Sequence, residues 1–502
     1  MAGRAAPVSP IHIDAPPSGL RYRFADNGVE VDGGLLDRLR AVCRQVDTDD
    51  ASRVDAGRDW WPLSILWATA GTVPARPAAV ARPSDSAQVS AVLALCDEAR
   101  VPVTPVAGRS GVCGASLPVF GGVSLDLCAL SGVHAVDDVS LVADVGAGTF
   151  GTDLEDELRS SHGVTLGHWP QSMELSTVGG WLACRSAGQY STRYGKIEDM
   201  VVGLDVALAD GSVVHTGGWP RAAVGPDLTQ LFVGSEGTMG IITGSRLRVH
   251  PVPAEDRRLA FGFGSFAEGL EACRRTLRRG ATPAVLRLYD EAESARTFGA
   301  DDTCVLVVLD EGDHVLIEAT IEVVTQECSA AQPLDPSLVE RWLEHRNDVS
   351  ALAALSRRHI VVDTIEIAAQ WSALLPIYED AVSRLRAMDG TLAASAHQSH
   401  AYSDGACIYF TFAGQGPEPD DLAWAEAYYA EAWQAVMDAT TARGGAISHH
   451  HGVGLNRARF LAPALGPAFA TLVDLKAAVD PHGILNPGKL GLPSPFGGAV
   501  WP

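Results

Sequence analysis

Three glycine-rich loops between residues 105 and 244 constrain the fold of this chain more than any other feature. They are Gly108-Arg109-Ser110-Gly111, Ser176-Thr177-Val178-Gly179-Gly180 and the stretch from Gly234 to Gly240. Successive backbone amides in such turns form a concave nest that binds anions, pyrophosphate among them. Each loop alone is compatible with an ordinary turn. Three of them in one region indicate a long dinucleotide that lies across several loops.

The first loop matches neither of the two common phosphate-binding motifs. A Rossmann fingerprint opens directly into a helix, whereas the next element here is predicted to be a strand at residues 123–127. A Walker loop ends in Gly-Lys-Ser or Gly-Lys-Thr, and Gly111 is followed instead by Val-Cys-Gly. The loops therefore predict a dinucleotide site of a different type.

The surrounding residues are predicted to form short strands and helices. Pro83-Ser84-Asp85 is a helix start, because an Asp side chain accepts hydrogen bonds from the free amides of a first turn. Apolar residues follow it at helical spacing. The other predicted elements are a helix at 148–160 and strands at 101–106, 123–127, 141–145 and 241–242. Pro251 and Pro253 mark the expected end of this domain.

From about residue 258 the pattern changes to strands that alternate with long amphipathic helices. The predicted strands are residues 259–263, 304–309, 360–366 and 408–412. The predicted helices are residues 266–278, 316–326, 350–358, 371–388 and 422–443. This alternation indicates a second domain of the α+β class.

The first 75 residues carry weaker signals. Residues 1–34 are rich in proline and glycine and are expected to be irregular, and helical pieces are expected over 35–75. Trp60, Trp61 and Trp67 are interpreted as a packing cluster, with a lid or a membrane-facing role as the alternative.

Composition excludes several classes of function. The net charge of −23 argues against nucleic acid as a partner and against broad attachment to anionic lipid. The nine cysteines form no CxxC pair and suggest neither a disulfide framework nor a structural zinc site. No run approaches about 18 apolar residues, the N-terminus has no apolar signal core, and the C-terminal AVWP carries no peroxisomal-type address. We expect a cytoplasmic protein with at most peripheral membrane contact, a small-molecule or lipid substrate and, as one possibility, a homodimer.

The segment Ser448–Gly454, with the sequence SHHHGVG, is the strongest catalytic signal in the second half. It is predicted to be the end of a strand that enters a tight glycine turn. Alternation along a strand would place His449 and His451 on one face and His450 on the other. Imidazole exchanges protons readily near neutral pH, so the triplet indicates acid–base chemistry. A hydrogen-bonded polar loop is the alternative interpretation.

The glycine loops also carry a family resemblance. The segments PVAGRSGVCG, PQSMELSTVGGW, YGKIEDMVVGL and LFVGSEGTMGII, which begin at residues 105, 170, 194 and 231, resemble the FAD-binding domain of the vanillyl-alcohol oxidase flavoprotein superfamily. The segments LRLYD, HAYSDGACIYFTF and SHHHGVG, together with GPDL at residues 225–228, resemble the alkylglycerone-phosphate synthase (alkyl-dihydroxyacetonephosphate synthase) family. The resemblance extends from about residue 75 to about residue 490.

This resemblance implies an α+β fold with a two-part FAD-binding domain and a C-terminal cap domain over the isoalloxazine ring. The expected parts are an N-terminal segment at 1–74, the FAD-binding domain at 75–255, the cap domain at 256–440 and a C-terminal segment at 441–502. The last segment carries the histidine loop and is expected to return to the flavin.

The resemblance also implies the residues that contact FAD. The pyrophosphate is expected over residues 106–111 and the flavin along 171–177, with further contacts from 184–187 and 236–242. The full set of expected contacts is Val106, Ala107, Gly108, Arg109, Ser110, Gly111, Val112, Pro170, Gln171, Ser172, Ser176, Thr177, Gly179, Gly180, Cys184, Arg185, Ser186, Ala187, Glu236, Gly237, Gly240, Ile241 and Ile242. Cys113 lies near the position where flavin-linking relatives keep a histidine, so noncovalent FAD is expected.

For catalysis the resemblance implies five residues, namely Tyr402, Arg287, His449, His450 and His451. Tyr402 matches the family's proton-transfer tyrosine, Arg287 an arginine needed for activity, and the histidines the active-site loop. The alternatives are a buried, hydrogen-bonded tyrosine and a plain ion pair between Arg287 and Asp290 or Glu291. The family's substrate-phosphate arginine has no clear counterpart, because Arg357 and Arg358 are offset from its position.

The reaction implied is exchange of the acyl group of an acyl-dihydroxyacetone phosphate for a fatty alcohol through a flavin N5 adduct, a step of ether lipid synthesis. The alternative is an FAD-linked dehydrogenase or oxidase acting on a 2-hydroxy acid or another alcohol, whose relatives share the tail DPHGILNPGK that begins at residue 480. Those dehydrogenases hold a divalent metal with two histidines and a glutamate. Here Ile408 stands near the second histidine and His450 replaces the glutamate, so no metal is expected, with zinc on His400, His450 and His451 as the alternative. A flavin-binding protein without catalysis is a third interpretation.

Overall fold

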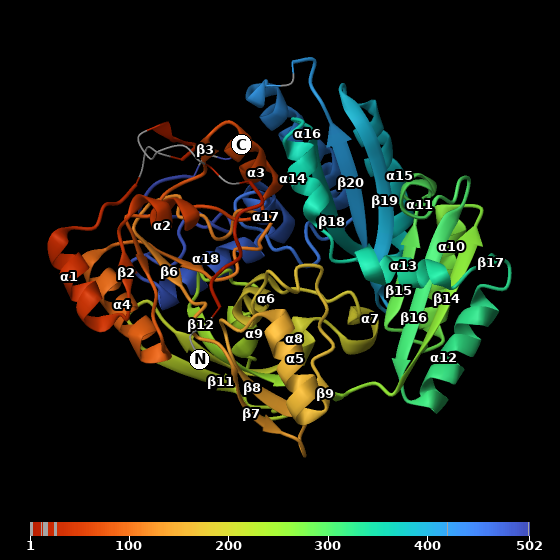
Figure 1. Cartoon of the computed structure of the whole chain (residues 1–502), viewed down its shortest axis with the longest axis horizontal. Helices are drawn as coiled ribbons and strands as arrows, with labels where there is room; N and C mark the ends of the chain where they lie inside the picture. The colour runs from red at the N-terminus through yellow and green to blue at the C-terminus, as the bar shows by residue number, and fades with distance from the viewer. Residues whose placement is uncertain are drawn as a thin grey trace.

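The computed structural model describes residues 4–11, 13, 19–24, 28–418, 420–499 and 501. Parts of the N-terminal stretch that was expected to be irregular, and Val500 and Pro502 of the C-terminal AVWP, lie outside the described residues. Figure 1 shows the first domain in red to yellow, the cap domain in green to light blue, and the C-terminal segment in dark blue between them.

The first half of the FAD-binding region is a small sheet with helices on it. Its strand order is β2-β4-β6-β5, and β6 is parallel to both β4 and β5. The strands are β2 (Val46–Asp47), β4 (Ala79–Ala81), β5 (Val103–Val106) and β6 (Val123–Asp126). The helices of this part are α1 (Gly33–Val42), α2 (Asp50–Asp55), α3 (Pro62–Thr69) and α4 (Ser86–Ala99). Asp85 caps α4 by accepting a hydrogen bond from the Gln88 amide, as the sequence predicts.

The second half is an antiparallel sheet in the order β11-β10-β12-β8-β7. Its strands are β7 (Val133–Asp137), β8 (Val142–Gly146), β10 (Val201–Ala207), β11 (Val213–Gly217) and β12 (Ile241–Arg248). The helices connected to it are α5 (Gly151–His162), α6 (Val178–Cys184), α7 (Ser191–Tyr194), α8 (Ile197–Met200) and α9 (Thr229–Phe232). Two short strand pairs, β1 (Arg21–Tyr22) with β3 (Thr72–Val73) and β9 (Val164–Thr165) with β13 (His250–Pro251), complete this region.

The cap domain contains an antiparallel seven-stranded sheet in the order β17-β14-β16-β15-β19-β20-β18. The strands are β14 (Glu255–Phe263), β15 (Val285–Tyr289), β16 (Cys304–Gly312), β17 (Gln332–Leu334), β18 (Val361–Gln370), β19 (Thr391–Ala401) and β20 (Gly405–Gly414). The helices are α10 (Phe266–Arg278), α11 (Glu291–Phe298), α12 (His314–Glu327), α13 (Ser337–His345), α14 (Ser350–Ser356), α15 (Trp371–Ala387) and α16 (Leu422–Thr441). Leu306 and Val308 pack in one hydrophobic cluster and Val305 and Val307 in another, so β16 is buried on both faces. That burial explains its continuous apolar sequence.

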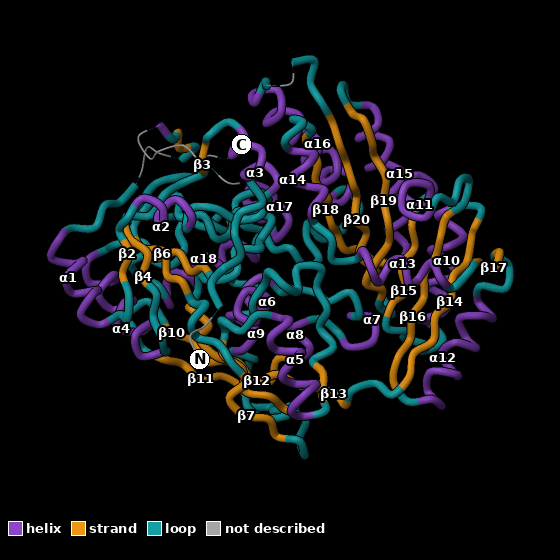
Figure 2. Tube along the Cα trace, viewed as in Figure 1, coloured by secondary structure: helices purple, strands orange, loops and turns teal. Residues whose placement is uncertain are grey.

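The C-terminal segment returns from the cap to the first domain. It contains α17 (Ala458–Leu465) and α18 (Ala468–Val479), after which Leu485 bridges to Val103 on β5. In the described part of the chain no single helix is long and apolar enough to cross a membrane, and α17 with α18 passes that test only as a pair bent by 116°. Figure 2 shows that loops occupy the centre of the molecule, between the sheets of the first domain and the cap sheet. The functional residues gather among these loops.

Most predicted elements are present at nearly the expected bounds. They include α4, β5, β6, β8 and α5 in the first domain, and β14, β16, β18, β20 and helices α10, α12, α14, α15 and α16 in the cap. Strand β12 begins at Ile241 as predicted but extends to Arg248, beyond the two residues expected. The sequence analysis missed β10, β15 and β19, although β19 carries two of the histidines that line the site. It was wrong for Ser448–Gly454, which belongs to no strand; Ala446, just before it, forms a bridge with Ala368 of β18.

Candidate functional site

A cavity of about 470 Å³ lies between the first domain and the cap. We call its two sides the dinucleotide wall, formed by lining residues from 105–116, 127, 147, 170–187 and 236–242, and the cap wall. The cap wall consists of Arg287, Glu293, Val349, Thr364, His397, His400, Tyr409, Thr411, His450 and His451. All FAD contacts expected from the sequence line the dinucleotide wall except Arg185.

Arg185 is a correction to the expected contacts. It ends α6 with a left-handed backbone (φ +57°), and its side chain contacts Glu198 and Gln230 at the surface. The backbone reversal at the helix end directs the side chain out of the cavity. Its neighbours Cys184, Ser186 and Ala187 do line the cavity.

The loop over residues 107–112 provides unused hydrogen-bond donors. No backbone N–H in this loop donates to another residue of the described chain. Arg109 has φ +53°, and its buried side chain turns away to pair with Asp55 at 2.8 Å and Asp126 at 3.2 Å. The loop therefore presents backbone amides rather than a guanidinium to the cavity, which suits a pyrophosphate held in a nest.

The second and third loops complete the dinucleotide wall. Thr177 caps α6, and the Trp181 indole donates to Ser176 Oγ at 2.7 Å. Glu236, on the third loop, is buried and accepts hydrogen bonds from the backbone N–H groups of Val453 and Gly454. Burial raises the pKa of Glu236 to about 7, although those hydrogen bonds oppose the shift. Glu236 therefore ties the histidine loop to the dinucleotide wall.

Glu366 of β18 determines the shape of the histidine loop. Its carboxylate accepts hydrogen bonds from the backbone N–H groups of His449 and His451, and it pairs with Arg457 at 2.8 Å, where neither side chain is exposed. Burial raises the pKa of Glu366, but the charge of Arg457 and the hydrogen bonds outweigh it, so that the pKa is lowered. Because the backbone curls around one carboxylate, strand alternation does not apply.

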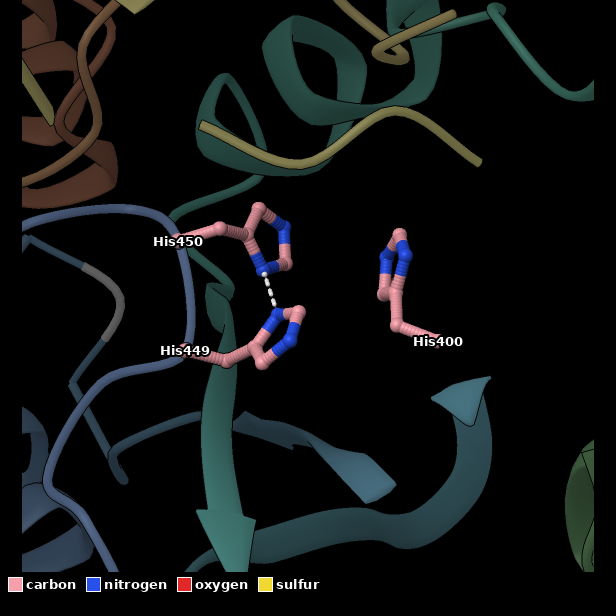
Figure 3. A group of neighbouring side chains, drawn as sticks. All are labelled: His400, His449 and His450. Carbon is pink, nitrogen blue, oxygen red and sulfur yellow. Dashed lines mark hydrogen bonds between the residues drawn. The ribbon is translucent and has the colours of Figure 1, made fainter. Parts of the chain in front are cut away.

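The predicted facing of the three histidines was therefore wrong. His449 and His450 lie next to each other and both face His400, as Figure 3 shows. Their Nδ1 atoms are 2.8 Å apart in a hydrogen bond. His451 instead approaches Glu366, with its Nδ1 atom 3.5 Å from the carboxylate. The conformation of the loop, rather than the alternation of side chains along a strand, decides which imidazole rings lie together.

Tyr402 and His449 are not among the residues that line the cavity. The Tyr402 hydroxyl lies 3.0 Å from His449 Nε2 and 3.2 Å from Ser191 Oγ, behind the cap wall. Tyr409 lines the cavity instead and hydrogen-bonds His450 Nε2 at 2.5 Å. A direct contact of Tyr402 with substrate is thus not supported by its position, and its predicted catalytic role stays a prediction.

Arg287 lines the cap wall without a carboxylate partner within 4 Å among the described residues. The alternative of an ion pair with Asp290 or Glu291 is wrong, because Asp290 caps α11 and accepts from the Ala396 amide. The guanidinium donates to His397 Nε2 at 2.6 Å, and His397 Nδ1 lies 2.9 Å from Glu293. Its Nε atom is buried without a partner, and the guanidinium reaches the cavity wall, where it can approach an anion.

Several lining residues were missed by the sequence analysis, among them Tyr409, Thr411, His397 and Glu293. For β20 a signal existed, since Ile408, Phe410 and Phe412 are fully buried and the alternate positions face the cavity side. For β19 no regular pattern would have sufficed. His397 and His400 are three residues apart and share a wall because the strand has an irregularity at Ser399–Ala401, where His400 has φ +51°.

The candidate metal ligands differ from the predicted alternative. His400, His449 and His450 have ring nitrogens within 4.8 Å of one another, whereas His451 is not part of this group. Five of their six ring nitrogens already have hydrogen-bond partners in the protein. Burial lowers the pKa of all three well below the ordinary value, with neighbouring charges adding to the effect. The cluster is thus satisfied as neutral imidazoles.

The dinucleotide wall fits FAD on three observations. The first loop has unpaired amides, Gly111 has open space where a side chain would be, and hydroxyls of Ser172, Ser176 and Thr177 lie along the same wall. Cys113 is buried and is not among the lining residues. The noncovalent binding expected from the sequence stays a prediction.

Comparisons with known proteins identify the family of this chain. Residues 77–217 match the family model described as FAD binding domain, and residues 252–490 match the model described as FAD linked oxidases, C-terminal domain. The chain is 32% identical over 431 residues to the uncharacterized FAD-linked oxidoreductase YgcU of Escherichia coli (strain K12), covering 82% of this chain and 89% of that protein. It is 29% identical over 460 residues to the alkyldihydroxyacetonephosphate synthase of Dictyostelium discoideum, covering 84% and 74%. A solved alkyldihydroxyacetonephosphate synthase superimposes with a TM-score of 0.77 at 24% identity, covering 96% of this chain and 88% of that one.

Proposed function

The chain belongs to the FAD-linked oxidase family and is an FAD-dependent enzyme, and we propose that it exchanges the acyl group of an acyl-dihydroxyacetone phosphate for a fatty alcohol. The product would be an ether lipid precursor. The similarity to alkyldihydroxyacetonephosphate synthases supports this choice within the family.

The proposal rests on one observation, that the guanidinium of Arg287 lines the cavity without a carboxylate partner. It is a cation on the wall of the cavity, its Nε atom has no partner in the described chain, and no carboxylate pairs with it. The Arg287 side chain is partly buried, and a cation held away from water without a counter-ion is costly. An anionic substrate group, such as a phosphate, would form charge-assisted hydrogen bonds with it. Arg287 therefore supports an anionic substrate whose reacting carbon lies toward the dinucleotide wall.

The proposed exchange needs groups that move protons. A proton must leave the carbon next to the substrate carbonyl, a fatty carboxylate must depart, and the incoming alcohol must lose its proton. His400 and Tyr409 are on the cap wall at positions suited to these transfers. The bound flavin supplies a ring that accepts electrons from the reacting carbon. Arg287 would hold the anionic group while the neutral acid–base groups act on the carbon.

The alternative is an FAD-linked oxidoreductase that acts on a 2-hydroxy acid or another alcohol, as the similarity to YgcU allows. Arg287 would then bind the carboxylate of the substrate. Ile408 argues for the exchange reaction, because it is a fully buried core residue and stands near the position expected for the second metal-binding histidine of the hydroxy-acid dehydrogenases. The strand presents Tyr409 to the cavity instead.

Anaerobic mixing experiments separate the two reactions. The FAD-loaded protein is mixed with palmitoyl-dihydroxyacetone phosphate and, in parallel, with D-lactate and D-2-hydroxyglutarate, while flavin absorbance is recorded. For the exchange reaction we expect bleaching by the acyl ketone, recovery when hexadecanol is added, and an ether product detected by mass spectrometry. Lasting bleaching by a hydroxy acid alone would contradict the proposal and establish the oxidoreductase.

An arginine variant tests the anion site. Arg287→Ala is expected to raise KM for the phosphorylated ketone by about 10²-fold, since a charge-assisted bidentate contact contributes about 3 kcal/mol. Arg346 provides the control, because it lies nearby over Trp169, Tyr190 and Trp342 without lining the cavity. Arg346→Ala should change KM by less than about threefold. Equal effects of both variants would remove the anion-site argument.

A further inference from the structure

One chain of hydrogen bonds connects two sides of the cap wall. It starts at His400 Nδ1, which lies 2.8 Å from Ser191 Oγ, and continues over 3.2 Å to the Tyr402 hydroxyl. From there it passes over 3.0 Å to His449 Nε2 and over 2.8 Å between the Nδ1 atoms of His449 and His450. It ends at Tyr409, 2.5 Å from His450 Nε2. Every link is within hydrogen-bond distance.

Both end groups of this chain line the cavity, and so does His450 beside Tyr409, whereas the other three residues of the chain do not. His400 and Tyr409 are lining residues, and Ser191, Tyr402 and His449 are behind them. The chain is assembled from three regions: Ser191 begins α7 in the first domain, His400, Tyr402 and Tyr409 belong to the cap, and His449 and His450 to the C-terminal segment. A hydrogen-bond network with only a structural role is not expected to have both of its ends at the same cavity.

We propose that His400, Ser191, Tyr402, His449, His450 and Tyr409 form a proton wire that takes a proton from the substrate at one end and delivers one at the other. This inference rests on the proposed function only in requiring that the substrate exchange protons. It assigns to Tyr402 a relay role in place of direct contact, and to Tyr409 and His400 the contacts with substrate.

The wire has two neutral states, because each imidazole carries one proton and each hydroxyl donates once. In the first state His400 and His449 carry the proton on Nδ1 and His450 carries it on Nε2. His400 Nε2 is then a base, and the Tyr409 hydroxyl is free to donate to the substrate. In the second state all these protons have moved by one link, so that His400 carries Nε2–H and Tyr409 donates to His450.

Conversion between the states balances protons. His400 Nε2 accepts a proton from the substrate, six protons each shift by one link, and the last of them, the Tyr409 hydroxyl proton, leaves to the substrate. No imidazolium or tyrosinate remains at the end. This matters in a buried cluster, where a charged side chain without a partner is costly. A concerted shift avoids those unfavourable charged forms.

Tautomer measurements test the wire without any substrate. In FAD-loaded protein labelled with ¹⁵N-histidine, NMR at pH 8 gives the fraction of Nδ1–H and Nε2–H in each ring, with peaks assigned by single histidine variants. We expect His400 and His449 to have equal Nδ1–H fractions and His450 to have the complementary fraction. Unequal fractions at His400 and His449, or the same tautomer at His449 and His450, would overturn the proposal.

Two variants interrupt the wire at residues that do not line the cavity. Ser191→Ala should decouple the tautomer of His400 while His449 and His450 stay complementary, and Tyr402→Phe should separate His449 from His400 in the same way. Thr192→Val is the matched control, because Thr192 is the next residue of α7 and its hydroxyl accepts from the Ala401 amide outside the wire. This control should leave the tautomer fractions unchanged.

Kinetics with the acyl ketone provide the second readout. Ser191→Ala and Tyr402→Phe are expected to lower kcat by about 10²-fold, with KM within twofold, and to reduce the number of protons seen in the solvent isotope dependence. Unchanged kcat and isotope dependence in both variants would show that no proton passes through the wire. If wild-type protein turns over no acyl ketone while the tautomers remain coupled, the proposed function fails and the wire stands.

Discussion

The two walls of the cavity are built in opposite ways. The dinucleotide wall presents mostly backbone amides, glycines and hydroxyls, supplied by three loops within one domain. The cap wall presents side chains of Arg, Glu, His and Tyr that come from β15, α11, β19, β20 and the C-terminal segment. A wall of backbone needs only the correct local turns. A wall of side chains forms only when segments far apart in the chain are fixed relative to one another. In this protein, hydrogen bonds and ion pairs of buried charged groups fix them.

The carboxylate of Glu366 illustrates the second kind of construction. It fixes two amides of the histidine loop and pairs with Arg457 in a place where neither side chain is exposed. Glu236 performs a related task from the other wall by accepting the amides of Val453 and Gly454. The histidine loop is therefore held between two buried carboxylates, one from each wall.

The largest effect is expected from removing the anchor of the cap wall. Glu366→Ala leaves the buried Arg457 without its ion-pair partner, which costs about 3–5 kcal/mol of the free energy of unfolding. Urea unfolding followed by tryptophan fluorescence measures it. The control is Glu318→Ala, because Glu318 pairs with Arg257 at the same 2.8 Å while both side chains are about half exposed. That surface pair should contribute less than about 1 kcal/mol, and equal losses in the two variants would remove the contrast between anchored and surface pairs.

A smaller effect is expected from crowding the dinucleotide wall. A Cβ atom on Gly108 would lie 2.0 Å from the Leu175 carbonyl oxygen. Gly108→Ala should therefore cost about 1–3 kcal/mol of the free energy of unfolding and lower the flavin content, measured by the absorbance ratio of flavin to protein.

Gly111→Ala is the matched control on the same loop. No protein atom lies within 4 Å of a Cβ at this position, and Gly111 lines the cavity. This variant should change the free energy of unfolding by less than about 0.5 kcal/mol. A loss of flavin affinity in Gly111→Ala would show that the cofactor approaches the backbone here, and unchanged affinity would place the pyrophosphate elsewhere.

The pH dependence of stability gives a further prediction. His168 lies beside the dinucleotide wall with no exposed surface, and burial, followed by the charge of Lys196, lowers its pKa to about 3. As pH falls below about 6.5, His168 binds a proton in the unfolded chain but not in the folded protein, so the free energy of unfolding decreases. Between pH 6.5 and pH 5 this one group should account for about 2 kcal/mol.

His168→Gln should remove that part of the acid sensitivity, which urea unfolding at the two pH values measures. The control is His215→Gln, because the His215 side chain is 73% exposed and should alter the difference by less than about 0.5 kcal/mol. An unchanged pH slope in His168→Gln would mean that the acid sensitivity arises in the imidazoles of the cap wall instead.

The sequence predicted a large part of the dinucleotide wall. All the contacts expected from the three glycine loops and the resemblance to FAD-binding domains line the cavity except Arg185, and that they bind FAD stays a prediction. Such loops can be predicted because they bind anions through the backbone amides of consecutive residues, and a sequence gives consecutive residues directly. The amphipathic helices α10, α12, α15 and α16 were predictable for a similar reason, since their periodicity is local.

The cap wall was predicted only in part. The sequence indicated Arg287 and the three histidines, but it placed the histidines on a strand, and it named Tyr402, which does not line the cavity. The carboxylate that bends the histidine loop, Glu366, is more than 80 residues away in the chain. No local pattern connects it to residues 449–451. Strand alternation therefore gave the wrong orientation for the three imidazole rings, because the carboxylate of Glu366 decides the loop conformation.

By itself, then, the sequence determined the class of cofactor, the two-domain α+β fold and the residue types available for chemistry. Only the tertiary structure decided which of those residues share the cavity. His397 and His400 meet on one wall through an irregular strand, Tyr409 replaces Tyr402 at the surface of the cavity, and Ser191 joins the network from the other domain. The physical reason is that backbone nests depend on neighbouring residues, whereas a side-chain network depends on the packing of elements far apart in the chain.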